Sequence, residues 1–132
     1  MSVALVATAH GVYAVDVDEA ELIGLVPDAR VPPPRRESPF PRTIAADAHG
    51  STLLVVVDRR PPLLVSHDAG VTWNEAGGGL PAGRAVAISP EHPDLVVYAG
   101  RNRLFVSRDG GRFWSALTLE LPEIEAVAWR AE

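Results

Sequence analysis

Short apolar runs separated by Gly, Pro, Asp and Asn make up most of this chain. Such runs are typical of β-strands bounded by turns, and no segment has an apolar period of 3.6 residues over the length of a helix. From residue 43 onwards the runs form two successive sets of four, which predicts two four-stranded antiparallel units. The expected strands are 43–47, 52–57, 63–66 and 72–76, and then 85–89, 95–99, 103–107 and 113–119.

The two ends of the chain supply the remaining strands. Runs at 3–7, 11–15 and 21–26 match the second to fourth strands of a unit, and the run at 125–130 matches a first strand. The first-strand match rests on two aligned sets, Ile44, Val86 and Val127, and Ala45, Ala87 and Ala128. Together these runs predict a third unit that joins both ends of the chain. The last strand could complete that unit in its own chain or in a partner chain.

One eight-residue pattern occurs twice, 41 residues apart, as SHDAGVTW and SRDGGRFW. The residues common to both copies are Ser66, Asp68, Gly70 and Trp73, and Ser107, Asp109, Gly111 and Trp114. A fixed period in this range indicates a repeat architecture, and four-stranded propeller blades have periods of about 40–50 residues.

The chemistry of the repeated residues predicts a tight turn. The aspartates can accept backbone N–H bonds, the serines can bond locally, and the glycines supply a positive φ. The tryptophans begin the next strand and can fill the space between neighbouring blades. Two loop carboxylates are too few for a calcium site.

The pattern S-x-D-x-G-x-x-W resembles the Asp-box, or BNR repeat, of sialidases and of many non-enzymatic β-propellers. The resemblance implies an all-β propeller with four-stranded blades, in which this turn is structural. We expect residues 1–132 to form a single half-propeller domain of three blades. Three blades are too few to close a ring, so we expect a homodimer with six blades, because two-fold dimers are the commonest closed oligomers.

The composition excludes some classes of site and of partner. The chain has 132 residues and no Cys, and all 12 basic residues are Arg, so thiolate sites and disulfides are excluded. The apolar beginning lacks the features of a signal peptide, and no apolar run reaches the ~20 residues of a membrane span. We expect a cytoplasmic protein of bacterial type, with no membrane or nucleic-acid partner.

The arginines are expected to gather at one end of the propeller, where the loops between strands D and A and between B and C emerge (strands A to D run from the axis outwards). This sorting assigns nine of the 12 arginines and six carboxylates to that end. The candidate ligand-binding residues are Arg42, Arg84, Arg59, Arg60, Arg101 and Arg103. Arg30, Arg35 and Arg36 are assigned to the same end because they lie in the proline- and arginine-rich D–A loop at 27–42. Its prolines exclude a central strand.

These observations predict a non-enzymatic binding or assembly scaffold with an anionic ligand or partner, such as a small molecule, a glycan or an acidic protein segment. Arg suits carboxylate and phosphate contacts, although the same arginines could instead pair with Glu123 and Glu125. The alternatives are a lectin-like binder of acidic sugars and a remnant sialidase-like hydrolase. The hydrolase lacks support because Tyr13 and Tyr98 have no acidic neighbour placed by a motif. No metal is expected, since the histidines have no ligand spacing. No catalytic residue and no cofactor are expected either.

Overall fold

The computed structural model describes residues 1–131 and contains three four-stranded antiparallel sheets, with no helix in that part of the chain. The prediction of an all-β fold is therefore confirmed. The first sheet has the order β12-β1-β2-β3, the second β4-β5-β6-β7, and the third β8-β9-β10-β11.

The observed strands follow the apolar runs closely. Those of the first sheet are β1 (Val3–Thr8), β2 (Gly11–Asp16), β3 (Glu21–Leu25) and β12 (Ile124–Trp129). Those of the second sheet are β4 (Thr43–His49), β5 (Thr52–Val57), β6 (Leu63–Ser66) and β7 (Asn74–Ala76). Those of the third sheet are β8 (Ala85–Ile88), β9 (Val96–Ala99), β10 (Leu104–Ser107) and β11 (Ser115–Ala116).

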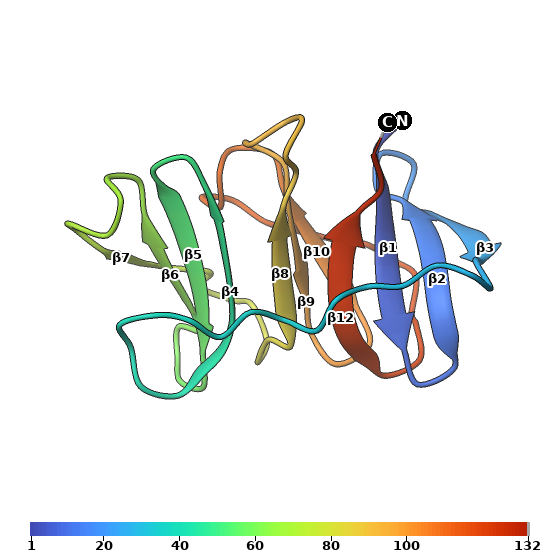
Figure 1. Cartoon of the computed structure of the whole chain (residues 1–132), viewed down its shortest axis with the longest axis horizontal. Helices are drawn as coiled ribbons and strands as arrows, with labels where there is room; N and C mark the ends of the chain where they lie inside the picture. Colours follow the sequence, from blue (N-terminus) through green and yellow to red (C-terminus); the bar gives the residue numbers. More distant parts are fainter. Residues whose placement is uncertain (132) are drawn as a thin grey trace.

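The last strand completes the first sheet of its own chain. β12 pairs antiparallel with β1, with Leu5 opposite Ala128 and Val6 opposite Val127. This pairing is the first of the two alternatives that the sequence left open, and it brings both ends of the chain to one sheet (Figure 1).

The three sheets meet along their first strands. β8 packs between β4 and β12, while β7 and β3 lie at opposite ends of the molecule (Figure 1). Two hydrogen bonds join β8 to its neighbours. The Trp129 indole N–H of β12 donates to the Ala87 carbonyl at 2.9 Å, and the Ile88 N–H donates to an Asp47 carboxylate oxygen of β4 at 2.7 Å. The third sheet thus lies in the middle.

The core is divided between the sheets. One buried cluster lies between the first and third sheets, around Val6, Val97 and Ile124, and another lies between the second and third sheets, around Leu54 and Tyr98. All residues of β8 and β9 are buried, because the third sheet is covered on both faces. Their runs are therefore continuously apolar rather than alternating.

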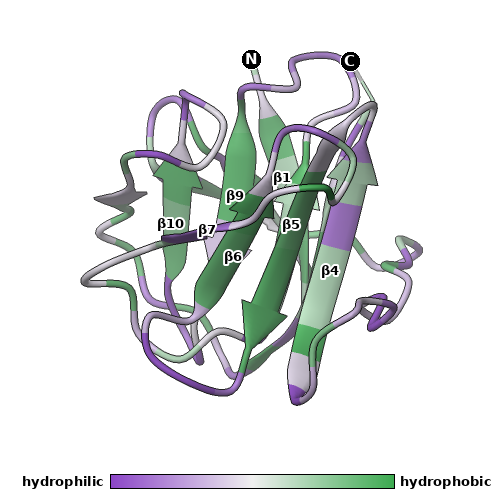
Figure 2. Ribbon diagram, turned by 90° about the vertical axis from the view of Figure 1, so that its left-hand side faces the viewer, coloured by the Kyte–Doolittle hydropathy of each residue, from purple (hydrophilic) through white to green (hydrophobic). Residues whose placement is uncertain are grey.

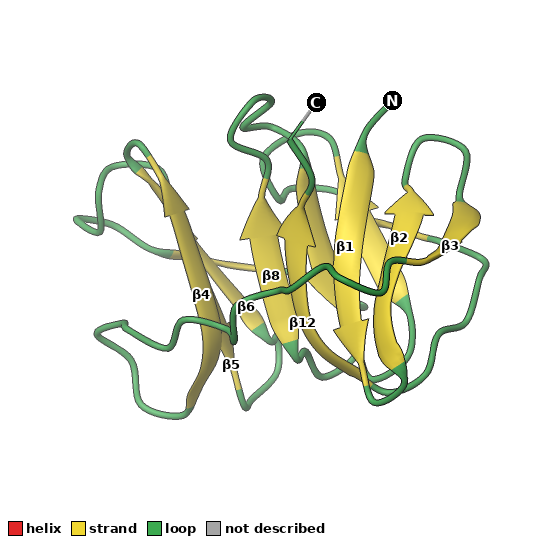
Figure 3. Ribbon diagram, turned by 45° about the vertical axis from the view of Figure 1, so that its right-hand side comes forward, coloured by secondary structure: helices red, strands yellow, loops and turns green. Residues whose placement is uncertain are grey.

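The segment 27–42, called the strap below, crosses in front of the first sheet and reaches β4 (Figures 1 and 3). The Ala46 N–H donates to the Arg35 carbonyl at 2.7 Å. Further along the strap, the Phe40 ring meets the Trp73 ring edge-on, with centroids 4.8 Å apart. The strap thereby covers apolar residues on the outer face of the second sheet, among them Val55 and Leu64. In Figure 2 the ribbons of β5 and β6 are coloured as predominantly hydrophobic.

The fourth strands are shorter than predicted. β7 and β11 begin after the repeated turns, at Asn74 and Ser115, rather than at 72 and 113. The reason is that the N–H groups of Thr72 and Phe113 donate to the turn carboxylates instead of to a neighbouring strand.

Candidate functional site

The turn 66–73 is held by its own polar groups. The Ser66 hydroxyl donates to an Asp68 carboxylate oxygen at 2.8 Å, and the Gly70 N–H donates to the same hydroxyl at 2.8 Å. Asp68 also accepts the Thr72 N–H at 2.9 Å. Gly70 has φ of 90°, a conformation that favours glycine. Finally, the Trp73 indole N–H donates to the Gly70 carbonyl at 3.1 Å.

The turn 107–114 repeats this arrangement. The Ser107 hydroxyl donates to Asp109 at 2.8 Å and accepts the Gly111 N–H at 2.8 Å. Asp109 accepts the Phe113 N–H at 3.0 Å, and the Trp114 indole donates to the Gly111 carbonyl at 3.0 Å. Gly111 has φ of 99°. The two turns therefore share a hydrogen-bond pattern as well as a sequence pattern.

The two turn carboxylates are held in their ionised form. Hydrogen bonds from Thr72 and Ser66 lower the pKa of Asp68 to about 2, although this carboxylate lies at the surface. Hydrogen bonds from the Phe113 N–H and the Ser107 hydroxyl also lower the pKa of Asp109. Within residues 1–131, no group of three or more His, Asp or Glu side chains is arranged to hold a metal ion.

Tyr98 is a core residue. Its side chain is fully buried, and burial raises the pKa of its phenol far above the usual value. The hydroxyl donates to the Pro81 carbonyl at 2.6 Å. A Cβ on Gly83 would lie only 2.4 Å from that hydroxyl, so only glycine fits there. Sequence reasoning missed this contact, because nothing in the sequence indicates that Gly83 adjoins Tyr98.

The arginine end is built from loops that meet at one end of the sheets. β4, β8 and β12 run in the same direction (Figure 3), so the loops that precede them lie at the same end as the β5–β6 and β9–β10 loops. This end carries the six predicted ligand-binding arginines, Arg42, Arg59, Arg60, Arg84, Arg101 and Arg103.

Four of the six arginines are already paired. Arg84 and Arg101 share Glu123, at 2.9 and 3.6 Å. Hydrogen bonding and charge from Arg84, with a further contribution from Arg101, lower the pKa of the Glu123 carboxyl. In addition, Arg103 pairs with Glu120 at 3.0 Å, and Arg59 with Glu75 at 3.8 Å. The alternative of pairing with Glu123, which the sequence left open, is therefore realised for two of the arginines.

The structure brings three arginines together at one hollow of about 430 Å³. Arg59 and Arg60 come from the β5–β6 loop and Arg84 from the end of the loop before β8. Apolar walls are formed by Ile44, Val57, Pro62, Leu80 and Ala82, and Asp58 also lines the hollow. Arg60 makes no ion pair with any residue of the described chain.

The other arginines of the prediction lie outside this hollow. Arg42 does not line it, although the Arg42 carbonyl accepts the Asp58 N–H at 3.0 Å beside it. Arg35, which was assigned to the same end together with Arg30 and Arg36, lies away from it. The strap crosses the molecule at mid-height (Figure 1), and Arg35 bonds to Ala46, in the middle of β4 rather than at its start.

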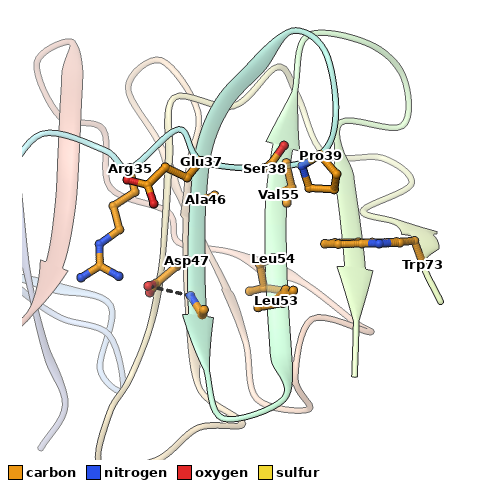
Figure 4. A pocket seen from close by; sticks show the side chains of 11 residues that line it. Arg35, Glu37, Ser38, Pro39, Ala46, Asp47, Leu53, Leu54, Val55 and Trp73 are labelled. Atoms are coloured by element: carbon orange, nitrogen blue, oxygen red, sulfur yellow. Dashed lines mark hydrogen bonds between the residues drawn. The ribbon is translucent and has the colours of Figure 1, made fainter. Parts of the chain in front are cut away.

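A smaller hollow of about 130 Å³ lies between the strap and the second sheet. Arg35 and Glu37 lie at one side of β4, and Pro39 and Trp73 lie beyond it over β5 and β6 (Figure 4). This hollow could not be predicted from the sequence, because it arises from the path of the strap.

Comparison of the chain with protein-family models, with curated proteins and with solved structures gives no match. In residues 1–131, no helix is long and apolar enough to cross a membrane.

Proposed function

We propose that this chain is a non-enzymatic binding scaffold whose arginine end holds a carboxylate or phosphate group of a partner. The proposal rests on one observation, the convergence of Arg59, Arg60 and Arg84 on a single hollow. Guanidinium groups suit bidentate contacts with such anions, and Arg60 makes no ion pair within residues 1–131.

The existing ion pairs leave room for a ligand. The side chains of Arg84 and Glu123 are 41% and 47% exposed, and exposed pairs contribute only ~0–1 kcal/mol to stability. A ligand carboxylate can therefore exchange with Glu123 at little cost. Because exposed charges are screened by salt, binding of this kind weakens as ionic strength rises.

The tyrosine and aspartate side chains that a sialidase-like hydrolysis would need also support a scaffold role rather than an enzymatic one. Tyr98 is buried with its hydroxyl bonded to a backbone carbonyl, and Asp68 and Asp109 accept bonds within their own turns. These groups are engaged in structure rather than directed at a common substrate position.

We also propose that the three sheets are blades of an Asp-box propeller and that two chains form a six-bladed ring. The two matching turns and the meeting of the sheets along β4, β8 and β12 support this. Sheets that pack face to face lie about 10 Å apart. In a closed ring a sheet of the partner chain would pack on the outer face of the second sheet, which the strap covers. Ring closure therefore requires the strap to leave this face or to become part of the interface.

The binding proposal is tested with fluorescently labelled poly-L-glutamate and fluorescence anisotropy. We expect Arg60→Gln together with Arg84→Gln to weaken binding about tenfold or more, since hydrogen bonds to charged groups contribute about 1.5–3 kcal/mol each. The matched control is Arg112→Gln together with Arg130→Gln, which removes two exposed arginines elsewhere. Equal losses in both double variants, or an affinity that ignores salt, would overturn the proposal.

The ring is tested by light scattering at micromolar concentration. A six-bladed ring predicts twice the chain mass of 14.1 kDa. A stable monomer would refute ring closure by two chains, and a trimer or tetramer would refute the count of six blades.

A further inference from the structure

A second hollow adjoins the arginine hollow and differs from it in character. It has a volume of about 680 Å³ and shares Arg60, Pro62 and Leu80 with its neighbour. The additional lining residues are Pro61, Gly77, Gly78, Gly79, Pro81 and Phe105. The shared residues make the two hollows one continuous groove, cationic at one end and apolar at the other.

The apolar end is held in place by packing. Phe105 is half-buried against the core between the second and third sheets, and its ring meets Tyr98 edge-on with centroids 6.1 Å apart. Tyr98 in turn fixes the Pro81 carbonyl through its hydroxyl. An aromatic ring and prolines held this way form a preformed surface for an apolar side chain.

Two of the glycines that line the groove, Gly78 and Gly79, are exposed. A Cβ added at Gly78 or Gly79 would meet nothing within 4 Å. Within residues 1–131, the N–H groups of these two glycines donate no hydrogen bond. A partner backbone can therefore approach closely, and free amides beside it can bond its carbonyls, as in other modes of peptide recognition.

We infer that this groove binds an acidic peptide segment that presents a carboxylate side chain and a neighbouring apolar side chain on the same side of its backbone. The carboxylate contacts Arg60 and Arg84, and the apolar side chain packs on Phe105 and Pro61. This inference rests on the proposed function and names its class of partner. An inorganic anion or a sugar acid would use only the cationic end and leave the apolar end unused.

The test uses the folded chain and the blocked tripeptide acetyl-Glu-Phe-Glu-carboxamide, followed by calorimetric titration. Two comparison peptides replace either the phenylalanine by serine or both glutamates by glutamine. The key variant is Gly78→Leu, which adds a bulky side chain at a residue that lines the groove and has no positive φ. Its control is Gly50→Asn, at an open turn position of positive φ that asparagine tolerates, between β4 and β5.

We expect the Glu-Phe-Glu peptide to bind at least tenfold more tightly than either comparison peptide. We also expect Gly78→Leu to abolish this preference, with Gly50→Asn leaving it intact. Equal binding of the serine peptide, equal binding of phenylacetate, or full binding by Gly78→Leu would overturn the inference. If the arginine variants still weaken poly-glutamate binding in those cases, the proposed function stands alone; if they do not, both proposals fail.

Discussion

The two repeated turns have nearly identical internal hydrogen bonds, but their tryptophan rings pack against different neighbours. Trp114 packs into the core between the second and third sheets, with its ring edge-on to Tyr98 and the centroids 5.8 Å apart. Trp73 lies on the outer face of the second sheet, where Phe40 of the strap meets it. One sequence motif thus sets the turn, whereas the neighbouring element sets the environment of its tryptophan.

This difference follows from the position of each sheet. The third sheet has a neighbour on both faces, so its turn directs Trp114 into an existing core. The outer face of the second sheet is covered by the strap rather than by another sheet. A partner chain in a closed ring would compete with the strap for the surface around Trp73.

The largest effect is expected from the tryptophans themselves. Trp114→Ala should lower the free energy of unfolding by about 3 kcal/mol, the lower end of the range for aromatic side chains cut to alanine, because its partly buried ring packs against the core between the second and third sheets. Trp73→Ala should cost less, about 2 kcal/mol, because its partner is a mostly exposed strap. Urea denaturation of both variants measures this. Equal losses would show that the two environments do not differ in energy.

A smaller effect is expected from releasing the strap. Phe40→Ala removes the edge-on contact with Trp73, and such aromatic pairs contribute about 0.5–1.5 kcal/mol beyond their buried area. The strap should then be cut faster by trypsin at Arg35 or Arg36, and the Trp73 fluorescence should shift to longer wavelength. Val71→Ala is the control, because Val71 is 80% exposed on a nearby turn. Unchanged cleavage would mean that Phe40 does not hold the strap.

The smallest effect is expected from acid. Because the folded-state pKa of Asp68 is about 2, below its ordinary value of 3.8, Asp68 contributes stability that is complete above about pH 4. That contribution is lost as pH falls through about 2. Asp68→Asn should therefore show a smaller drop in melting temperature between these pH values than the wild-type chain. An identical drop would contradict the hydrogen-bonded, ionised state of this carboxylate.

The strands could be predicted from the sequence because each is a short apolar run between turn residues, as in 52–57 and 63–66, which match β5 and β6. The shared first sheet followed from the alignment of Val127 and Ala128 with earlier first strands. The path of the strap could not be predicted, because it depends on one backbone bond to Ala46 and on the Phe40–Trp73 contact. Nor could the groove, since Arg60, Gly78 and Phe105 come from three separate loops and strands.

An NMR titration of the chain with poly-L-glutamate, read residue by residue, tests whether the arginine end is the binding face. We expect the amide signals that move to lie in the loops 57–62, 77–84 and 100–103, at the arginine end. Signals of the two repeated turns, 66–73 and 107–114, should stay in place. Shifts confined to those turns, or spread evenly over the chain, would show that the arginine end is not the binding face.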